Sequence, residues 1–196
     1  MDCVTVVDLE TTGLCADRGD RIIEIGAIKL RDNKIVGVFN TLVNPNRKIP
    51  TLAQEITGIS PDMVKDSPSI DYVLKKFIDF AGDDTLVMHN AKFDGSFIRY
   101  ELKHLKIEKE FEYYCTLINS RKILKSSNYK LATLKNLLKL NTFGNMHRAL
   151  CDTYVTAQLY LKLKKMFGID TTNTLERDMD RLTSQLTSED FFILDN

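Results

Sequence analysis

The sequence lacks the features that mark membrane, secreted and zinc-binding proteins. No apolar run approaches the roughly 20 residues that a membrane-spanning helix needs, and the first residues form no signal peptide. The four cysteines include no CxxC pair, so neither a disulfide framework nor a zinc site is indicated. These absences predict a cytoplasmic protein with reduced thiols and without a membrane partner.

The sequence also lacks net charge, because its 27 basic residues equal its 27 acidic residues in number. A neutral chain by itself argues against a nucleic-acid partner, but the charges are unevenly spread. Residues 166–196 hold seven acidic and two basic residues, which leaves a net charge of +5 on residues 1–165 and −5 on the tail. The mildly basic body therefore keeps a nucleic-acid partner among the alternatives.

Hydrophobic periodicity predicts a single mixed α/β domain, since 196 residues can bury one substantial core. The first strand should be central, because apolar side chains occupy both of its faces. Asp32 and Asn33 are turn formers that predict an antiparallel hairpin between the next two strands. The predicted strands are residues 3–10, 21–30, 34–43, 85–89 and 111–116. The predicted helices are 68–82, 90–105, 131–140 and 147–167, and residues 51–61 should form a short helix that leads into a Gly-containing turn.

Two acidic residues end the first strand. Side chains alternate along a strand, so Asp8 and Glu10 share the face of Val4 and Val6. Buried acids need a proton, a partner or a cation, and two acids on one face raise each other's pKa. The alternative is a frayed strand end with both acids in water.

Two further acidic residues lie in unusual surroundings. Asp94 falls in the first turn of the helix after a buried strand, where it could simply complement the helix dipole. Asp152 lies on the inner side of an apolar helix, where an unpaired charge would be costly. Four acids at one strand end would form an oxygen-rich pocket that recruits Mg²⁺ or Mn²⁺. His147, at the entrance of the last helix, would then be a candidate base.

Three motifs in this order resemble those of the DEDDh exonuclease superfamily: "VVDLETTGL", "HNAKFD" and "HRALCDT". The similarity covers residues 4 to about 165 and is greatest to the proofreading exonucleases of bacterial replicative DNA polymerases, including "RIIEIGAIKL" and "EITGIS". The resemblance implies a ribonuclease-H-like fold, in which a five-stranded mixed sheet is flanked by helices. It also implies 3′→5′ hydrolysis of single-stranded DNA ends to nucleoside 5′-monophosphates.

The resemblance implies two Mg²⁺ or Mn²⁺ ions and a role for each acidic residue. Asp8 would bridge both ions, Glu10 and Asp152 would complete the first, and Asp94 would hold the second through water. His147 would take a proton from the attacking water, a task that suits a group titrating near neutrality.

The resemblance also implies contacts to the substrate. Thr11, Thr12 and Gly13 would reach the terminal 3′-hydroxyl, although Thr12 could equally belong to an ordinary turn. Ile56 would be a wedge under the last base or a core residue, and Asn90 would contact substrate or cap its helix.

Glu24 interrupts the second strand. Because this strand is expected to be central, Glu24 is predicted to be buried and structural, hydrogen-bonded to Arg21 or a loop amide.

Two alternatives to a DNA exonuclease remain open. The same acids serve RNA-trimming members of the superfamily, and no motif here reveals a contact to a 2′-hydroxyl. A non-catalytic module that binds nucleic acid or a polymerase is disfavoured, because all five functional positions are present.

The chain is expected to divide into an exonuclease domain, 1–165, and an acidic C-terminal helical extension, 166–196. A helix over 173–187 would carry a narrow apolar seam, followed by the "FFIL" cluster at 191–194. We expect residues 173–194 to bind a partner, such as a DNA polymerase subunit or a second copy. The alternative is that this helix folds back over the domain. The seam consists of Leu175, Met179, Leu182 and Leu186.

Overall fold

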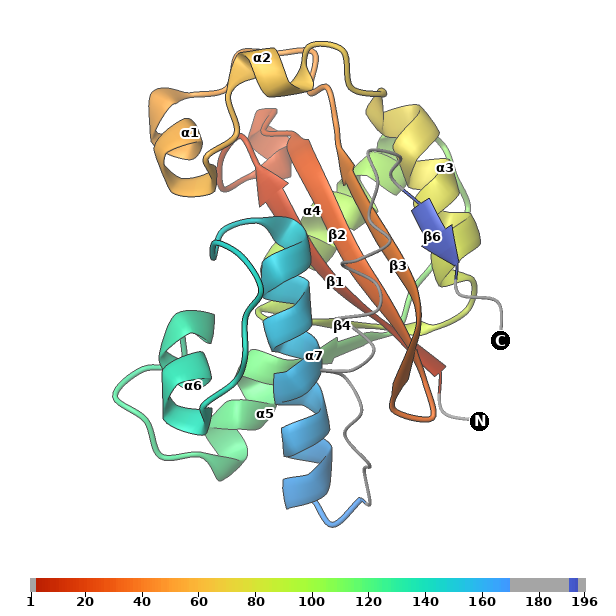
Figure 1. The fold of residues 1–196 in the computed structure, drawn as a ribbon. Coiled ribbons are helices and arrows are strands. Elements are labelled where there is room, and N and C mark those ends of the chain that lie inside the picture. The colour runs from red at the N-terminus through yellow and green to blue at the C-terminus, as the bar shows by residue number, and fades with distance from the viewer. Residues whose placement is uncertain (1–2, 170–190, 194–196) are drawn as a thin grey trace.

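A computed structural model describes residues 3–169 and the backbone of Phe191–Ile193, and its centre is a mixed β-sheet (Figure 1). The strand order is β5-β4-β1-β2-β3-β6. β1 pairs antiparallel with β2 and parallel with β4, which confirms its predicted central place. The strands are β1 (Cys3–Thr11), β2 (Ile22–Arg31), β3 (Lys34–Leu42), β4 (Thr85–Met88), β5 (Tyr113–Cys115) and β6 (Phe191–Ile193).

Alternation along β1 divides its side chains between two hydrophobic cores. Val4 and Val6 belong to the core beneath α7 (Ala149–Met166). Val7 and Leu9 face the opposite core, which is lined by α3 (Ile70–Ala81) and α4 (Ala91–His104). Both faces of the strand are therefore covered, as its apolar sequence predicts.

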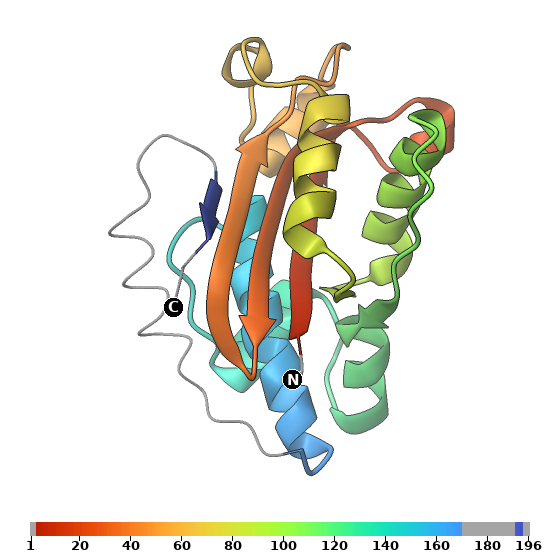
Figure 2. The ribbon, with the colours of Figure 1, turned by 90° about the vertical axis from the view of Figure 1, so that its right-hand side faces the viewer.

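The helices lie on both sides of the sheet. Figures 1 and 2 show α7 along one face, while α3 and α4 cover the other. In the described residues, no helix combines the length and the apolar character needed to span a bilayer. The shorter helices are η1 (Ala16–Arg18), α1 (Thr51–Thr57), α2 (Pro61–Val64), α5 (Thr116–Ile123) and α6 (Leu131–Leu138).

Local signals set several of these boundaries. Asp32 and Asn33 adopt positive φ angles of 49° and 66°, which close the predicted hairpin between β2 and β3. The short helix predicted within 51–61 is α1, and it ends at the predicted Gly-containing turn, where Gly58 takes a left-handed conformation; α2 then starts at Pro61. The sequence pattern does not predict α5, whose eight residues are too few for a clear period.

The end of the chain adds a sixth strand to the predicted five. Phe191–Ile193 pairs antiparallel with Gly37–Phe39 of β3, so these three residues lie against their own domain. The helix predicted over 173–187 lies outside the described residues, and the predicted boundary at 165 is one residue before the end of α7.

Candidate active site

Asp8 and Glu10 lie within β1, near its carboxyl end. Asp8 pairs with Gly26 of β2, and Glu10 pairs with Glu24. Asp8 is half-buried and Glu10 is only 8% exposed. The alternative of a frayed end with both acids in water is therefore wrong for this strand.

Asp94 is fixed to β1 by a hydrogen bond. β1 pairs with β4 only as far as Val6 and Val87. Beyond that point the N–H of Leu9 donates to Asp94 Oδ1 at 3.2 Å, in a buried contact. Because Leu9 stands between Asp8 and Glu10, this bond brings a third carboxylate to the same strand end. Asp94 therefore does more than complement the dipole of α4.

The start of α7 brings Asp152 and His147 to the same place. His147 lies before the helix with a positive φ of 66°, and Asp152 lies in the first turn. The N–H of His147 donates to Asp152 Oδ2 at 3.2 Å. This agrees with the prediction of a histidine at the helix entrance and an aspartate one turn inside.

The side chains of Glu10, His147 and Asp152 could hold a metal ion. One potential ligand atom of each lies within 4.8 Å of the other two. Asp152 Oδ1 is buried without a hydrogen-bond partner in the described part of the chain. A buried carboxylate oxygen left unpaired is costly, and a hard cation would satisfy it. The donor set therefore fits a divalent cation such as Mg²⁺ or Mn²⁺.

The carboxylates strongly perturb one another's protonation. Burial, followed by the charges of Asp94, Glu10 and Asp152, raises the pKa of Asp8 well above its usual value. Burial and the charges of Asp152 and Glu24 raise the pKa of Glu10 to about 8. Burial raises the pKa of Asp94 to about 7, and burial also raises that of Asp152. Such a cluster favours a bound cation over four bare charges.

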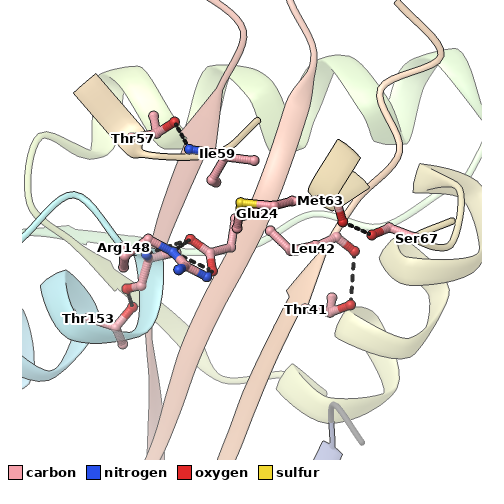
Figure 3. Close-up of polar contacts among 10 residues, drawn as sticks. Glu24, Thr41, Leu42, Thr57, Ile59, Met63, Ser67, Arg148 and Thr153 are labelled. Carbon is pink, nitrogen blue, oxygen red and sulfur yellow. Dashed lines mark hydrogen bonds and ion pairs between the residues drawn. The ribbon is translucent and has the colours of Figure 1, made fainter. Parts of the chain in front are cut away.

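Glu24 is buried and structural, as predicted, but its partner is not Arg21. Glu24 accepts hydrogen bonds from Arg148 Nη2 at 2.7 Å and from the N–H of Ala149 at 2.9 Å (Figure 3). Arg21 instead pairs with Glu101, with Nε 2.9 Å from Oε1. Glu24 therefore ties β2 to the residues that follow His147.

Gly26 allows β2 and the start of α7 to approach closely. A Cβ atom there would lie 2.4 Å from the carbonyl carbon of Ala149 and from the nitrogen of Leu150. Thr153 Oγ1 donates to the carbonyl of Gly26 at 2.9 Å. The roles of Gly26 and Arg148 were not predicted from the sequence, although a glycine inside a central strand is itself a signal of close backbone approach.

The loop after Glu10 uses its polar groups internally. Thr11 Oγ1 donates to the carbonyl of Gly13, and the N–H of Arg21 donates to Thr12 Oγ1. A Cβ on Gly13 would lie 2.4 Å from a carboxylate oxygen of Asp20, so a larger residue there would displace the Asp20 side chain. The hydroxyls of Thr11 and Thr12 thus shape this loop beside the acids.

Asn90 and Ile56 lie outside the acid cluster. Asn90 precedes α4 with φ 72°, and its side chain does not cap the helix, so that alternative is wrong. It lines an open pocket of about 400 Å³ with Leu14, Lys92 and Phe93. Ile56 lies on α1 with 51% of its surface exposed, so it is not a core residue.

Comparisons with known proteins agree with this arrangement. Residues 5–160 match the exonuclease family RNase_T. The chain is 43% identical over 159 residues to a PolC-type DNA polymerase III of Caldanaerobacter subterraneus, covering 81% of this chain and 11% of that protein. It is 36% identical over 166 residues to the DNA polymerase III subunit epsilon of Rickettsia typhi, covering 81% of this chain and 72% of that subunit. The chain thus spans only a small part of the PolC-type proteins that it matches.

A solved structure supports the same relationship. Exonuclease X in complex with 5′ overhanging duplex DNA is 29% identical, with a TM-score of 0.70 over 88% of this chain and 98% of that chain. The predicted ribonuclease-H-like fold and the resemblance to components of bacterial DNA polymerase III are therefore confirmed. From the match over residues 5–160, this chain belongs to the exonuclease (RNase_T) family.

Proposed function

We propose that this chain is a divalent-metal-dependent 3′→5′ exonuclease that releases nucleoside 5′-monophosphates from single-stranded DNA ends. The observation that carries the proposal is the meeting of Asp8, Glu10, Asp94, His147 and Asp152, from three separate segments, at one end of β1. Family membership and the 29% identity to exonuclease X support it.

The four carboxylates would hold two divalent cations. Asp8, Glu10 and Asp152 would bind one ion, with Asp8 shared, and Asp94 would bind the second through water. Bound cations would neutralise the cluster and stabilise the charge that develops on the phosphodiester. The unpaired Oδ1 of Asp152 and the raised pKa of Glu10 support a binding role for these carboxylates.

His147 would act as the general base. Its ring is exposed, so a water molecule can reach it, and one ring nitrogen lies within 4.8 Å of carboxylate oxygens of Glu10 and Asp152. That nitrogen would accept the proton of the water that attacks the terminal phosphodiester. The bond from its own N–H to Asp152 would hold the histidine backbone in place during the transfer.

The substrate end would lie between the loop after Glu10 and α1. Thr11, Thr12 and Gly13 would position the terminal nucleotide through the loop backbone, which the hydroxyls of Thr11 and Thr12 shape. The exposed Ile56 would pack under the last base, and Asn90 would contact the strand from the start of α4.

The cellular role would be proofreading in DNA replication or repair. This is supported by the names of relatives, which are PolC-type and epsilon components of DNA polymerase III. The partner would be a DNA polymerase subunit or a second copy, bound through the part of residues 173–194 that precedes β6, because Phe191–Ile193 already pair with β3. Pull-down of full-length and truncated chains with a polymerase subunit would test this partner.

The activity is tested by digestion of 5′-labelled DNA and RNA oligonucleotides of one sequence, with Mg²⁺, with Mn²⁺ and with EDTA. We expect a stepwise ladder on single-stranded DNA that requires the metal and releases nucleoside 5′-monophosphates. A ladder on RNA alone would reassign the substrate to RNA. Binding of either strand without any hydrolysis would indicate a non-catalytic module.

A further inference from the structure

One long stretch of this chain contains no acidic residue. Residues 113–151 run from β5 to the first turn of α7 without Asp or Glu. The remainder of residues 1–165 holds 18 basic and 20 acidic residues, so the positive excess of the body comes entirely from this stretch. Its seven basic residues are Arg121, Lys122, Lys125, Lys130, Lys135, Lys139 and Arg148.

Most of these charges lie on residues 116–139, which we call the basic arm: α5, α6 and the loop between them. Lys122, Lys125 and Lys130 are exposed. Among the described residues, no hydrogen bond or ion pair engages their ammonium groups. Cations gathered without counter-charges create a positive potential that attracts a polyanion.

The basic arm is fastened to the elements that carry the acid cluster. His89, directly after β4, has Nδ1 2.9 Å from Thr116 Oγ1 and Nε2 2.9 Å from the carbonyl oxygen of Tyr129. Leu134 of α6 packs against Val155 of α7 in a shared hydrophobic cluster. The arm is therefore held in a fixed position relative to α4, which follows His89, and to α7.

The arm lies beside the site. β4 runs parallel to β1, with Val6 opposite Val87, so His89 and the arm residue Tyr129 that it contacts lie towards the carboxyl end of β1, where the acids are. Lys135 lies on α6 next to Leu134, which packs against Val155 of α7, about one turn after Asp152. The positive surface and the acid cluster are thus neighbours.

We propose that the basic arm binds the phosphate backbone of the single strand whose 3′ end occupies the acid cluster. This inference rests on the proposed function, which places the 3′ end of the strand at the acid cluster. A single strand carries one negative charge per nucleotide, which the acid cluster repels and the arm attracts. An acidic protein surface is the other polyanion that could bind, but continuity with the site favours the strand.

The test uses the full chain with Lys122, Lys125 and Lys130 replaced together by glutamine. Binding of a fluorescent single strand of about 20 nucleotides is followed by anisotropy in EDTA over a range of salt concentrations. The plot of log affinity against log salt concentration has a negative slope, and each lost phosphate contact makes that slope less steep by about 0.7. The slope of the triple variant should therefore be less steep than that of wild type by about 2. Its Kd at low salt should rise about tenfold or more.

The control variant also loses lysine charges, but from a surface outside the basic arm. Lys75 and Lys76 are exposed on α3, which packs on the opposite face of the sheet from α7. Replacing both by glutamine should leave the Kd and the salt slope within error of wild type. If the triple variant fails to fold by circular dichroism, each single variant should lose about 0.7 from the slope.

Hydrolysis gives a second readout. The ratio of kcat/KM for the long strand to kcat/KM for a dinucleotide should fall in the triple variant, because the single internucleotide phosphate of a dinucleotide lies at the acid cluster and leaves none for the arm. An unchanged Kd, slope and ratio would overturn the proposal and leave the arm to an acidic protein partner. Binding is measured without hydrolysis, so an inactive wild type would refute the proposed function while the inference about the arm is still tested.

Discussion

Replacing Gly26 by alanine should push the start of α7 away from β2. The new Cβ would lie 2.4 Å from Leu150 nitrogen and from Ala149 carbonyl carbon, and 2.7 Å from the carbonyl oxygen of Ala149. These are backbone atoms of a helix, so no flexible side chain can move aside. The contact can be relieved only by separation of the two elements.

The size of the effect follows from these distances. Non-bonded carbon atoms prefer about 3.5–4.0 Å, so the helix start must move by roughly 1 Å. Overpacking of this kind costs about 1–3 kcal/mol of stability. The same movement displaces His147 and Asp152 from Glu10, and a 1 Å misplacement can cost about 10²-fold in rate. Activity should therefore fall much further than stability.

The assay compares kcat on a single-stranded oligonucleotide with the free energy of unfolding in urea. Gly144 provides the control, because nothing lies within 4 Å of a Cβ built there and its φ is not positive. Gly144→Ala should leave both quantities nearly unchanged. A folded Gly26→Ala protein with wild-type kcat would refute the view that close packing of β2 and α7 positions the site.

Three further predictions concern the acid cluster. Asp8→Ala should reduce kcat with Mg²⁺ to less than about a tenth of wild type while the protein stays folded by circular dichroism; greater retention would argue against a bridging role. His147→Ala should slow single-turnover hydrolysis by about 10²–10⁴-fold, and the rise of rate towards neutral pH should disappear. Persistence of that rise would place the base elsewhere. Burial raises the pKa of Glu10 to about 8 and that of Asp94 to about 7, so the folded protein retains protons that the unfolded chain has released. The free energy of unfolding in EDTA should therefore fall between about pH 5 and pH 8, and urea titrations with added Mg²⁺ should show a smaller fall.

Much of the site could be predicted from local pattern. The two-residue period of β1 placed Asp8 and Glu10 on one face, and the five-residue separation of His147 from Asp152 placed the histidine outside the helix. These inferences succeed because they depend only on strand and helix geometry. Asp94 could be assigned to the site only from the family motif, because an acidic residue in the first turn is common in any helix.

The remaining features depend on contacts between distant segments. Arg148 is 124 residues from Glu24, so the sequence suggested nearby partners instead, namely Arg21 or a loop amide. Asn90 adopts a left-handed conformation, and its side chain makes no capping hydrogen bond to the first turn of α4, so the possible helix cap does not form. β6 is only three residues long and follows an acidic segment, and such a short run carries no strand period.

The central claim is that the acid cluster binds divalent cations in exchange for protons. The most direct measurement is calorimetric titration of the metal-free protein with Mn²⁺ near neutral pH, in two buffers with different enthalpies of ionisation. Because the pKa of Glu10 is about 8 and that of Asp94 about 7, we expect saturable binding with net release of protons. The same titration of Asp8→Ala should show much weaker binding. Tight binding without proton release, or binding unchanged in Asp8→Ala, would contradict the account.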